Sequence, residues 1–243
     1  MDIIIKTSLI GLFFGTFGTT VGGIIGVFIN HKSNKLLSIV LSFASGLMMS
    51  VVYFDLLPEA MEISNITKTI IGIILGIIIM FLCDILVQKK FSTKINKNSL
   101  LKTGIIVSIG IALHNFPEGL AIGSGFDASI TLGYSLAIAI CLHDIPEGIS
   151  MALPMRGGGM NKIKIIIYVI LSGITTGIGA LFGTIAGKIS ENVIAICLSF
   201  AAGAMIYIVS GELIPESNKL YSGKWSVIAN VLGIIIGLIS IKI

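Results

Sequence analysis

Long apolar runs separated by short polar breaks dominate this chain of 243 residues. Runs such as Ile70–Leu82, Ile163–Ile174 and Val227–Ile241 are rich in isoleucine, and with their flanks they reach the roughly 20 residues that a helix needs to cross a bilayer. They are apolar all round rather than on one face, which is typical of helices in contact with lipid. The short alternating strands of a membrane β-barrel are not evident in the pattern. The pattern therefore predicts membrane-spanning helices.

The polar breaks divide the chain into eight predicted spans and leave no segment that fits a soluble domain. Composition agrees, because 55% of the residues are hydrophobic and only 12% are charged, whereas about a quarter of the residues of a soluble domain are charged. We expect an all-α integral membrane protein with a single transmembrane domain over residues 1–243. The predicted spans are 4–29, 36–58, 67–88, 101–124, 129–154, 163–187, 192–215 and 224–243.

Basic residues are divided unequally between the two sides of the membrane when successive loops are assigned to alternate sides. Under the positive-inside rule, the side richer in Lys and Arg is cytoplasmic. We therefore expect a multi-pass protein of the cell membrane with both termini outside the cytoplasm. The first span is too long for a cleaved signal peptide, so we expect it to be retained. The twelve basic residues on the richer side are Lys32, Lys35, Lys89, Lys90, Lys94, Lys97, Lys102, Arg156, Lys162, Lys164, Lys219 and Lys224, and the four on the other side are Lys6, Lys68, Lys188 and Lys242.

Two distant segments of the chain resemble each other at a constant offset. Between residues 41–59 and 198–216, ten of nineteen positions are identical at an offset of 157 residues. The similarity extends over the first three and the last three spans, which are five spans apart, so the second copy would cross the membrane in the opposite direction. Inverted repeats around a mid-membrane site are a recurrent architecture of transporters. We predict inverted repeats at 4–88 and 161–243 around a central hairpin at 101–154, a 3+2+3 arrangement.

A six-residue motif occurs twice in this central hairpin. His114–Gly119 reads HNFPEG, and 29 residues later His143–Gly148 reads HDIPEG. We expect a polar turn near Gly123–Ser129, which places each histidine roughly 18–24 Å along its helix from the outer edge. Both copies then lie near the middle of the membrane. Because His and Glu are four positions apart in each copy, they share a helix face, and the two pairs can face each other.

Ionisable side chains deep in a membrane are rare and usually functional. Imidazole and carboxylate ligands suit zinc, iron(II), manganese or cadmium better than magnesium or calcium, which prefer oxygen alone. The proline of each motif frees one backbone carbonyl and bends the helix, which leaves room for a cation. Asn115 and Asp144 are rotated by about 100° from their histidines, toward a second subsite that Glu118 and Glu147 would bridge. The alternative is a pair of buried His–Glu ion pairs with only a structural role.

The paired motif resembles the fourth and fifth transmembrane helices of the ZIP family of divalent-metal transporters, in its bacterial branch. The resemblance extends over all eight spans, including the outside termini and the 3+2+3 arrangement. It implies a transporter and not an enzyme, with no cofactor, whose substrate is zinc or another divalent transition metal. By the resemblance, six residues match the positions that form a binuclear metal centre in the family, namely His114, Asn115, Glu118, His143, Asp144 and Glu147.

The chain departs from many ZIP proteins at two places. Where some relatives carry an acidic or histidine ligand in the sixth helix, this chain reads Gly173–Gly177, in which Thr176 offers only a hydroxyl. The loop Gln88–Leu101 is basic and has no histidine, so it is not expected to hold metal as a histidine-rich loop would. His31 lies in a predicted cytoplasmic loop and receives no role.

Two acidic residues lie near the predicted mouths of the metal pathway. Asp55 ends the second span on the outer side, and its repeat counterpart Glu212 ends the seventh span on the inner side. Negative charge at each mouth would concentrate cations, although both could be ordinary helix-end charges among the lipid headgroups. We expect metal to enter past Asp55, bind between the fourth and fifth spans, and leave to the cytoplasm past Glu212.

An intramembrane metalloprotease is the alternative function. It would need the zinc-binding signature HExxH, and neither copy of the motif supplies it. The expected partners are the metal ion and the lipid bilayer, and a net charge of +4 does not indicate nucleic-acid binding. Small-residue faces such as Gly11–Gly15 and Gly22–Gly26 would allow helices to slide, or would form a static interface or a homodimer. The methionines and cysteines are expected to be packing residues.

Overall fold

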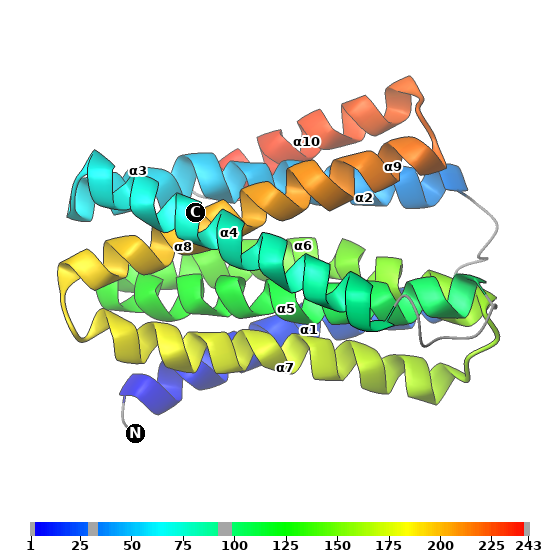
Figure 1. Cartoon of the computed structure of the whole chain (residues 1–243), viewed down its shortest axis with the longest axis horizontal. Helices are drawn as coiled ribbons and strands as arrows, with labels where there is room; N and C mark the ends of the chain where they lie inside the picture. The colour runs from blue at the N-terminus through cyan, green and yellow to red at the C-terminus, as the bar shows by residue number, and fades with distance from the viewer. Residues whose placement is uncertain (1–2, 29–33, 92–98, 241–243) are drawn as a thin grey trace.

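The chain folds as a bundle of long helices (Figure 1). The computed structural model describes residues 3–28, 34–91 and 99–240, and no strand occurs within them. The prediction of an all-helical protein is therefore confirmed. The α-helices are α1 (Ile3–Phe28), α2 (Asn34–Val51), α3 (Leu57–Ile63), α4 (Ile66–Phe91), α5 (Ser99–Ala128), α6 (Ile130–Gly157), α7 (Lys162–Gly187), α8 (Glu191–Ile208), α9 (Ile214–Leu220) and α10 (Lys224–Ser240), with two π-helical segments, η1 (Val52–Leu56) and η2 (Val209–Leu213).

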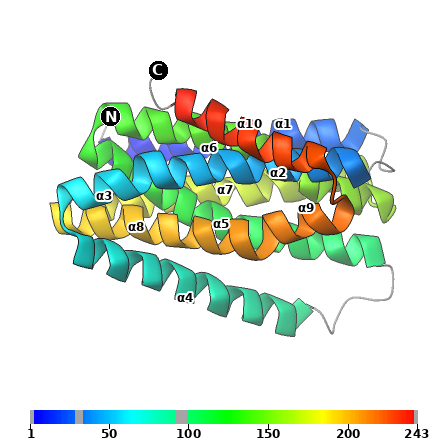
Figure 2. The ribbon, with the colours of Figure 1, turned by 90° about the horizontal axis from the view of Figure 1, so that it is seen from above.

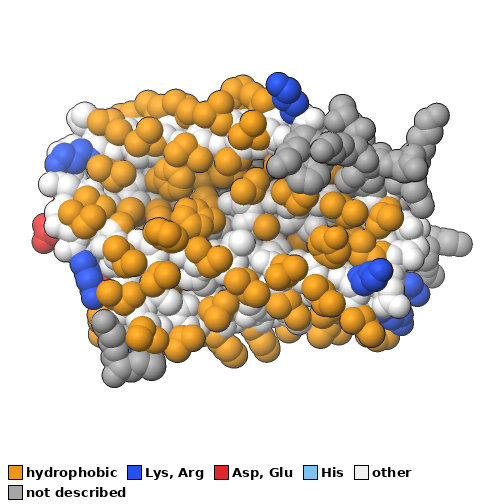
Figure 3. Space-filling model, turned by 60° about the horizontal axis from the view of Figure 1, so that its bottom comes forward, with side chains coloured by type: hydrophobic (Ala, Val, Ile, Leu, Met, Phe, Trp, Pro, Cys, Tyr) orange, Lys and Arg blue, Asp and Glu red, His pale blue; other side chains and the backbone are white. Residues whose placement is uncertain are grey.

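The bundle has the surface of a membrane protein. Within the described residues, seven helical segments of 22 to 30 residues are long and apolar enough to cross a membrane, and the helix Lys224–Ile239 is apolar but shorter. In that grouping α2, η1 and α3 form one continuous segment, as do α8, η2 and α9. Figure 3 shows hydrophobic side chains over the sides of the bundle, while most of the visible Lys and Arg side chains lie toward its two ends. An apolar surface this extensive is typical of contact with lipid.

The hairpin of α5 and α6 is tighter than predicted. Instead of a turn over Gly123–Ser129, α5 continues through Ala128, and Ser129 alone separates it from α6. Ser129 has an extended backbone, and its side-chain oxygen accepts a hydrogen bond of 3.1 Å from the N–H of Leu132. Ser129 thus caps the start of α6. Because one residue suffices for the turn, residues 123–128 remain helical in α5.

Both ends of the described chain lie toward the same end of the bundle. The start of α1 and the end of α10 both point toward that end in two views (Figures 1 and 2). A chain whose ends are on one side has crossed the bundle an even number of times.

Two π-helical segments interrupt the second and seventh predicted spans, which the sequence analysis did not anticipate. In η1 the N–H of Leu57 donates to the carbonyl of Val52, five residues back, and the same arrangement occurs in η2. Pro58 and Pro215 come two residues after the ends of these π segments, and the missing proline N–H removes the ordinary bond four residues back. The wider π turn is one way to accommodate that loss, and such turns are frequent at functional sites.

The segments around the two π turns have the same internal plan. Every boundary of α2, η1 and α3 differs from its counterpart in α8, η2 and α9 by 157 residues. Asp55 lies in η1, and Glu212 lies at the same position in η2. Both spans end later than predicted, at Ile63 and Leu220, because a helix readily restarts with proline in its first turn.

The helices form two groups. In the first, α1 packs on α6, α7 packs on α5, and α5 and α6 lie side by side (Figures 1 and 2). Glycines permit this approach, because a Cβ on Gly22 would overlap the carbonyl oxygen of Ile145 and one on Gly179 would overlap that of Phe116. In the second group, α10 packs on α2 and α4 packs on α8.

The main hydrophobic core lies where the two groups meet. There α2 contacts α6 and α8 contacts α5. Met48 of α2 and Met205 of α8 are fully buried in this core together with Leu136 and Ile140 of α6. The packing role predicted for these two methionines is therefore confirmed.

Candidate metal centre

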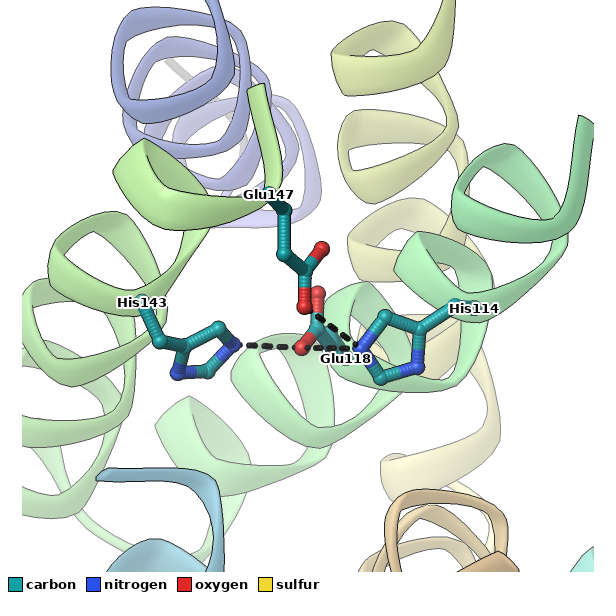
Figure 4. A group of neighbouring side chains, drawn as sticks. All are labelled: His114, Glu118, His143 and Glu147. Atoms are coloured by element: carbon teal, nitrogen blue, oxygen red, sulfur yellow. Dashed lines mark hydrogen bonds and ion pairs between the residues drawn. The ribbon is translucent and has the colours of Figure 1, made fainter. Parts of the chain in front are cut away.

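Two histidines and two glutamates, one pair from each copy of the motif, meet between α5 and α6 (Figure 4). His114 Nε2 lies 3.1 Å from Glu118 Oε1 and 3.2 Å from Glu147 Oε1. His143 Nε2 lies 2.5 Å from the same oxygen of Glu118. One potential ligand atom from each residue lies within 4.8 Å of all the others. Ligands about 2.0–2.2 Å from one zinc ion are roughly 3–4 Å apart, so this spacing suits a shared ion.

The two copies of the motif reach the same depth because the α5–α6 hairpin is nearly symmetric. His114 lies 14 residues before the end of α5 at Ala128, and His143 lies 14 residues after the cap residue Ser129. At 1.5 Å per residue, each histidine is about 21 Å from the turn. Both helices continue through their motif prolines, so the predicted bends do not interrupt either helix.

The cluster leaves polar atoms that its own contacts do not satisfy. All four side chains are buried, with exposed fractions of 2% or less. Within the described chain, one atom of each residue has no hydrogen-bond partner, namely Nδ1 of His114, Nδ1 of His143, Oε2 of Glu118 and Oε2 of Glu147. Unpartnered polar atoms in an apolar interior are costly. Ion pairing alone therefore leaves the second oxygen of each carboxylate unsatisfied, and a cation bound at the cluster would engage these oxygens together with the two Nε2 atoms. The Nδ1 atoms point away from the cluster (Figure 4).

Asp144 and Asn115 are buried beside this cluster but differ in their contacts. Oδ1 of Asp144 lies 3.9 Å from His143 Nε2, and neither of its oxygens has a hydrogen-bond partner among the described residues. Asn115 turns its amide nitrogen toward α7, where it donates to the carbonyl of Ser172 at 3.1 Å. The four His and Glu side chains are therefore brought together, Asp144 lies at their edge, and Asn115 is directed partly away.

Comparison with known proteins decides the family. The family model described as "ZIP Zinc transporter" matches residues 88–243, which include both copies of the motif and every residue of the cluster. This chain belongs to the ZIP family. It is accordingly a multi-pass membrane protein of a transporter family, and the match gives no support to the intramembrane metalloprotease.

Individual ZIP relatives cover the chain to different extents. Zinc transporter ZupT of Akkermansia muciniphila is 31% identical over 96% of this chain and 94% of its own length. ZupT of Clostridium perfringens is 30% identical over 99% of this chain and 96% of its own. Zinc transporter ZIP11 of Xenopus tropicalis is 42% identical over 54% of this chain, but the match spans only 41% of that protein. The near-complete matches to ZupT agree with the predicted bacterial branch of ZIP.

The sixth-helix position of this ZIP chain carries no carboxylate. Thr176 of α7 is fully buried, and its hydroxyl has no hydrogen-bond partner within the described residues. Its usual acceptor in a helix would be the carbonyl of Ser172, which is already approached by Asn115 at 3.1 Å and by the hydroxyl of Thr175 at 2.6 Å. Ser172 and Thr175 were missed from the sequence, because hydroxyl side chains on an apolar helix carry no distinctive motif.

The two acidic residues of the predicted pathway differ in exposure. Asp55 is 6% exposed, and its Oδ2 lacks a hydrogen-bond partner in the described chain. Glu212 is exposed, and its charge interacts with Asp84 and with His114 and Glu147 of the metal centre. Glu212, in η2, is thus close enough to the cluster for their charges to affect each other. His31 and residues 92–98 of the Gln88–Leu101 loop lie outside the described residues.

Proposed function

We propose that this ZIP-family chain carries divalent transition-metal ions, zinc foremost, through the cell membrane into the cytoplasm. The observation that carries the proposal is the buried cluster of two imidazoles and two carboxylates whose ligand atoms lie within 4.8 Å of one another. Buried ionisable groups within a membrane span mark ion pathways. The names of the ZupT and ZIP11 relatives support zinc as the cargo. The chain is a transporter and not an enzyme.

The donor set determines which ions the site accepts. Two imidazole nitrogens and two carboxylate groups suit zinc, iron(II), manganese and cadmium, while magnesium and calcium favour sites made of oxygen alone. Asp144 supplies further oxygens beside the cluster, and Asn115 supplies the amide oxygen that has no partner of its own. We assign these two residues to a second subsite, bridged to the first by Glu118 and Glu147, so that the centre is binuclear.

An inverted repeat supports movement of one helix group against the other. The sequence offset of 157 residues, which α2, η1 and α3 share with α8, η2 and α9 in every boundary, is expected if α1–α4 and α7–α10 are two copies of one unit. Counting the shorter α10 as a span, the arrangement is eight helices in a 3+2+3 order. The metal centre belongs entirely to the group of α1, α5, α6 and α7, so sliding of this group against the other would expose the centre alternately to each side.

The orientation follows from the basic residues. Twelve Lys and Arg residues on one predicted side against four on the other support an orientation with both termini outside the cytoplasm, by the positive-inside rule. Metal then enters past the buried Asp55 and leaves past the exposed Glu212. The lipid bilayer covers the apolar sides of the bundle. The Gly11–Gly15 and Gly22–Gly26 faces are buried against α7 and α6, so a homodimer would have to use another surface.

Uptake of radioactive zinc into proteoliposomes tests the transport proposal. The wild-type chain is expected to accumulate zinc, and His143→Ala and Glu147→Ala are expected to abolish uptake while the proteins remain folded. Glu216→Gln is a matched control, because Glu216 is an exposed carboxylate paired with Lys219 at 3.4 Å. Normal uptake by both site variants would defeat the site assignment. Competition by cadmium, manganese and iron(II) in the same vesicles would rank the cargo.

A further inference from the structure

The two halves of the metal site have equally close backbone contacts with their neighbouring helices. Gly119 of α5 packs against the carbonyl of Thr176 in α7, and Gly148 of α6 packs against the carbonyl of Thr19 in α1. In each case a Cβ would overlap the carbonyl oxygen, so neither glycine position accepts a side chain. Any difference in how the two halves are held must therefore come from the side chains around these contacts.

Hydrogen bonds between α5 and α7 hold the α5 half of the metal site. The hydroxyl of Thr175 lies 2.7 Å from the carbonyl oxygen of Ala112 in α5 and 2.6 Å from that of Ser172 in its own helix, so its single proton is shared between these two acceptors. Asn115 Nδ2 donates to the carbonyl of Ser172 at 3.1 Å and lies 3.5 Å from the Ser172 hydroxyl. Two polar contacts therefore cross the α5–α7 interface within one helical turn. The Asn115–Ser172 contact is buried and the Thr175–Ala112 contact is partly buried, and a hydrogen bond is electrostatically stronger in such an interior than in water.

Within the described residues, the α6 half is connected to α1 more weakly, by a contact between the Cys141 thiol and the backbone of Gly18. The α1 residues that correspond to Ser172 and Thr175, at an offset of 157, are Gly15 and Gly18. A Cβ on Gly18 would come within 2.8 Å of the Cβ of Asp144, so the contact there is steric. Asp144 has no hydrogen-bond partner in the described part of the chain. The α5 half is thus held by hydrogen bonds from oxygen and nitrogen groups, whereas the α6 half has only the softer thiol contact and leaves the Asp144 carboxylate available to a cation.

The two hydrogen bonds with α7 flank His114, a proposed metal ligand, where α5 lacks one of its own backbone hydrogen bonds. Ala112 and Asn115 lie on either side of His114 in the chain. Pro117 lies two residues after Asn115, and its missing N–H deprives the carbonyl of Leu113 of its usual helical partner. Because α5 lacks one of its own bonds here, the bonds from α7 help to determine how the backbone of His114 is oriented. The direction of the imidazole depends on that backbone.

We propose that Thr175 is a positioning residue for metal binding, which orients His114 through its bond to Ala112 and acts together with the bond between Asn115 and Ser172. This role rests on the proposed function of the site. A substitution can remove the Thr175 hydroxyl. No substitution of Ser172 removes the other acceptor, because that acceptor is a backbone carbonyl. A pocket whose ligands are held in advance binds its ion more tightly.

Thr175→Val keeps the shape of the side chain and removes the donor. We expect zinc binding to weaken by about five- to tenfold, the effect of losing one typical hydrogen bond. The measurement is calorimetric titration of the purified full-length protein with zinc, followed by uptake in proteoliposomes. KM for zinc should rise with little change in Vmax. A loss of correctly folded protein would instead lower Vmax and leave the affinity of the remaining molecules unchanged.

Matched variants separate positioning from packing. Thr175→Ser restores the donor and should restore affinity. Thr19→Val should leave affinity unchanged, because the buried Thr19 hydroxyl bonds to the carbonyl of Gly15 in its own helix at 2.7 Å. If Thr175→Val does not fold, Thr175→Ala compared with Thr175→Ser makes the same test. Wild-type affinity in the Val or Ala variant, or equal weakening in Thr19→Val, would overturn the role. A wild-type chain that binds no zinc would defeat the proposed function instead.

Discussion

His143 Nε2 and Glu118 Oε1 are 2.5 Å apart, although the two residues belong to different helices and different copies of the motif. The same oxygen lies 3.1 Å from the Nε2 of His114. One carboxylate oxygen therefore faces both imidazoles, and the second oxygen of Glu118 has no partner within the described residues. Glu118 is the side chain that links the two halves of the proposed centre.

Glu118→Gln should weaken zinc binding by at least about 100-fold. The amide preserves the shape but loses the charge, and even residues that only orient metal ligands typically contribute factors of 10–100. Calorimetric titration with zinc measures the change, and a thermal melt without metal checks that the variant is folded. Asn115→Ala should have a smaller effect, because only its amide oxygen is free for metal. Zinc affinity within threefold of wild type in Glu118→Gln would show that this carboxylate is not a ligand.

The sequence predicted the parts of the structure that depend on periodicity. Continuous apolar runs indicated helices in lipid, and the spacing of four residues between His114 and Glu118 indicated a shared face, which the cluster confirms. Features that depend on neighbouring helices were not predictable. The turn of Asn115 toward Ser172 is decided by how α7 packs on α5. The π turns were missed because a proline is also compatible with a simple kink, and only tertiary packing selects between the two.

Gly179→Ala should destabilise the protein by about 1–3 kcal/mol, the usual effect of inserting a methyl group into a packed interface. The new Cβ would overlap the carbonyl oxygen of Phe116 in α5, so α7 would have to move away from the metal site. Thermal unfolding in detergent measures the loss. Gly110→Ala in α5 is the matched control, because nothing lies within 4 Å of the position of its Cβ. That control should be neutral or stabilising by up to about 1 kcal/mol, since alanine favours a helix. Equal stability of the two variants would argue against close packing of α7 on α5.

Pro58→Ala should impair transport more than stability. Alanine restores the N–H that can bond four residues back, which removes the reason for the π turn at Val52–Leu56. Conversion of a π turn to an α turn rotates the residues before it by up to about 100° relative to those after it, so Asp55 would change direction. We expect slower zinc uptake and an unchanged melting temperature or a small increase. Pro154→Ala is a useful comparison, because Pro154 lies inside α6 without a π turn. Full transport activity in Pro58→Ala would show that the wide turn is not needed.

From the unequal exposure of Asp55 and Glu212 we predict that the cytoplasmic mouth of the pathway is open and the outer mouth is closed. These residues occupy the same position in η1 and η2, yet Asp55 is 6% exposed whereas Glu212 is exposed. In a background with Cys83, Cys141 and Cys197 replaced by alanine, Glu212→Cys should react quickly with a hydrophilic thiol reagent added to the cytoplasmic side, and Asp55→Cys should react slowly and only from outside. Oriented vesicles and mass spectrometry of the labelled protein measure both rates. Substitution at Lys219, which is exposed near the same end as Glu212, provides a cytoplasmic reference position. Faster labelling of Asp55→Cys, or labelling of Glu212→Cys from the outside, would reverse the proposed direction of the pathway.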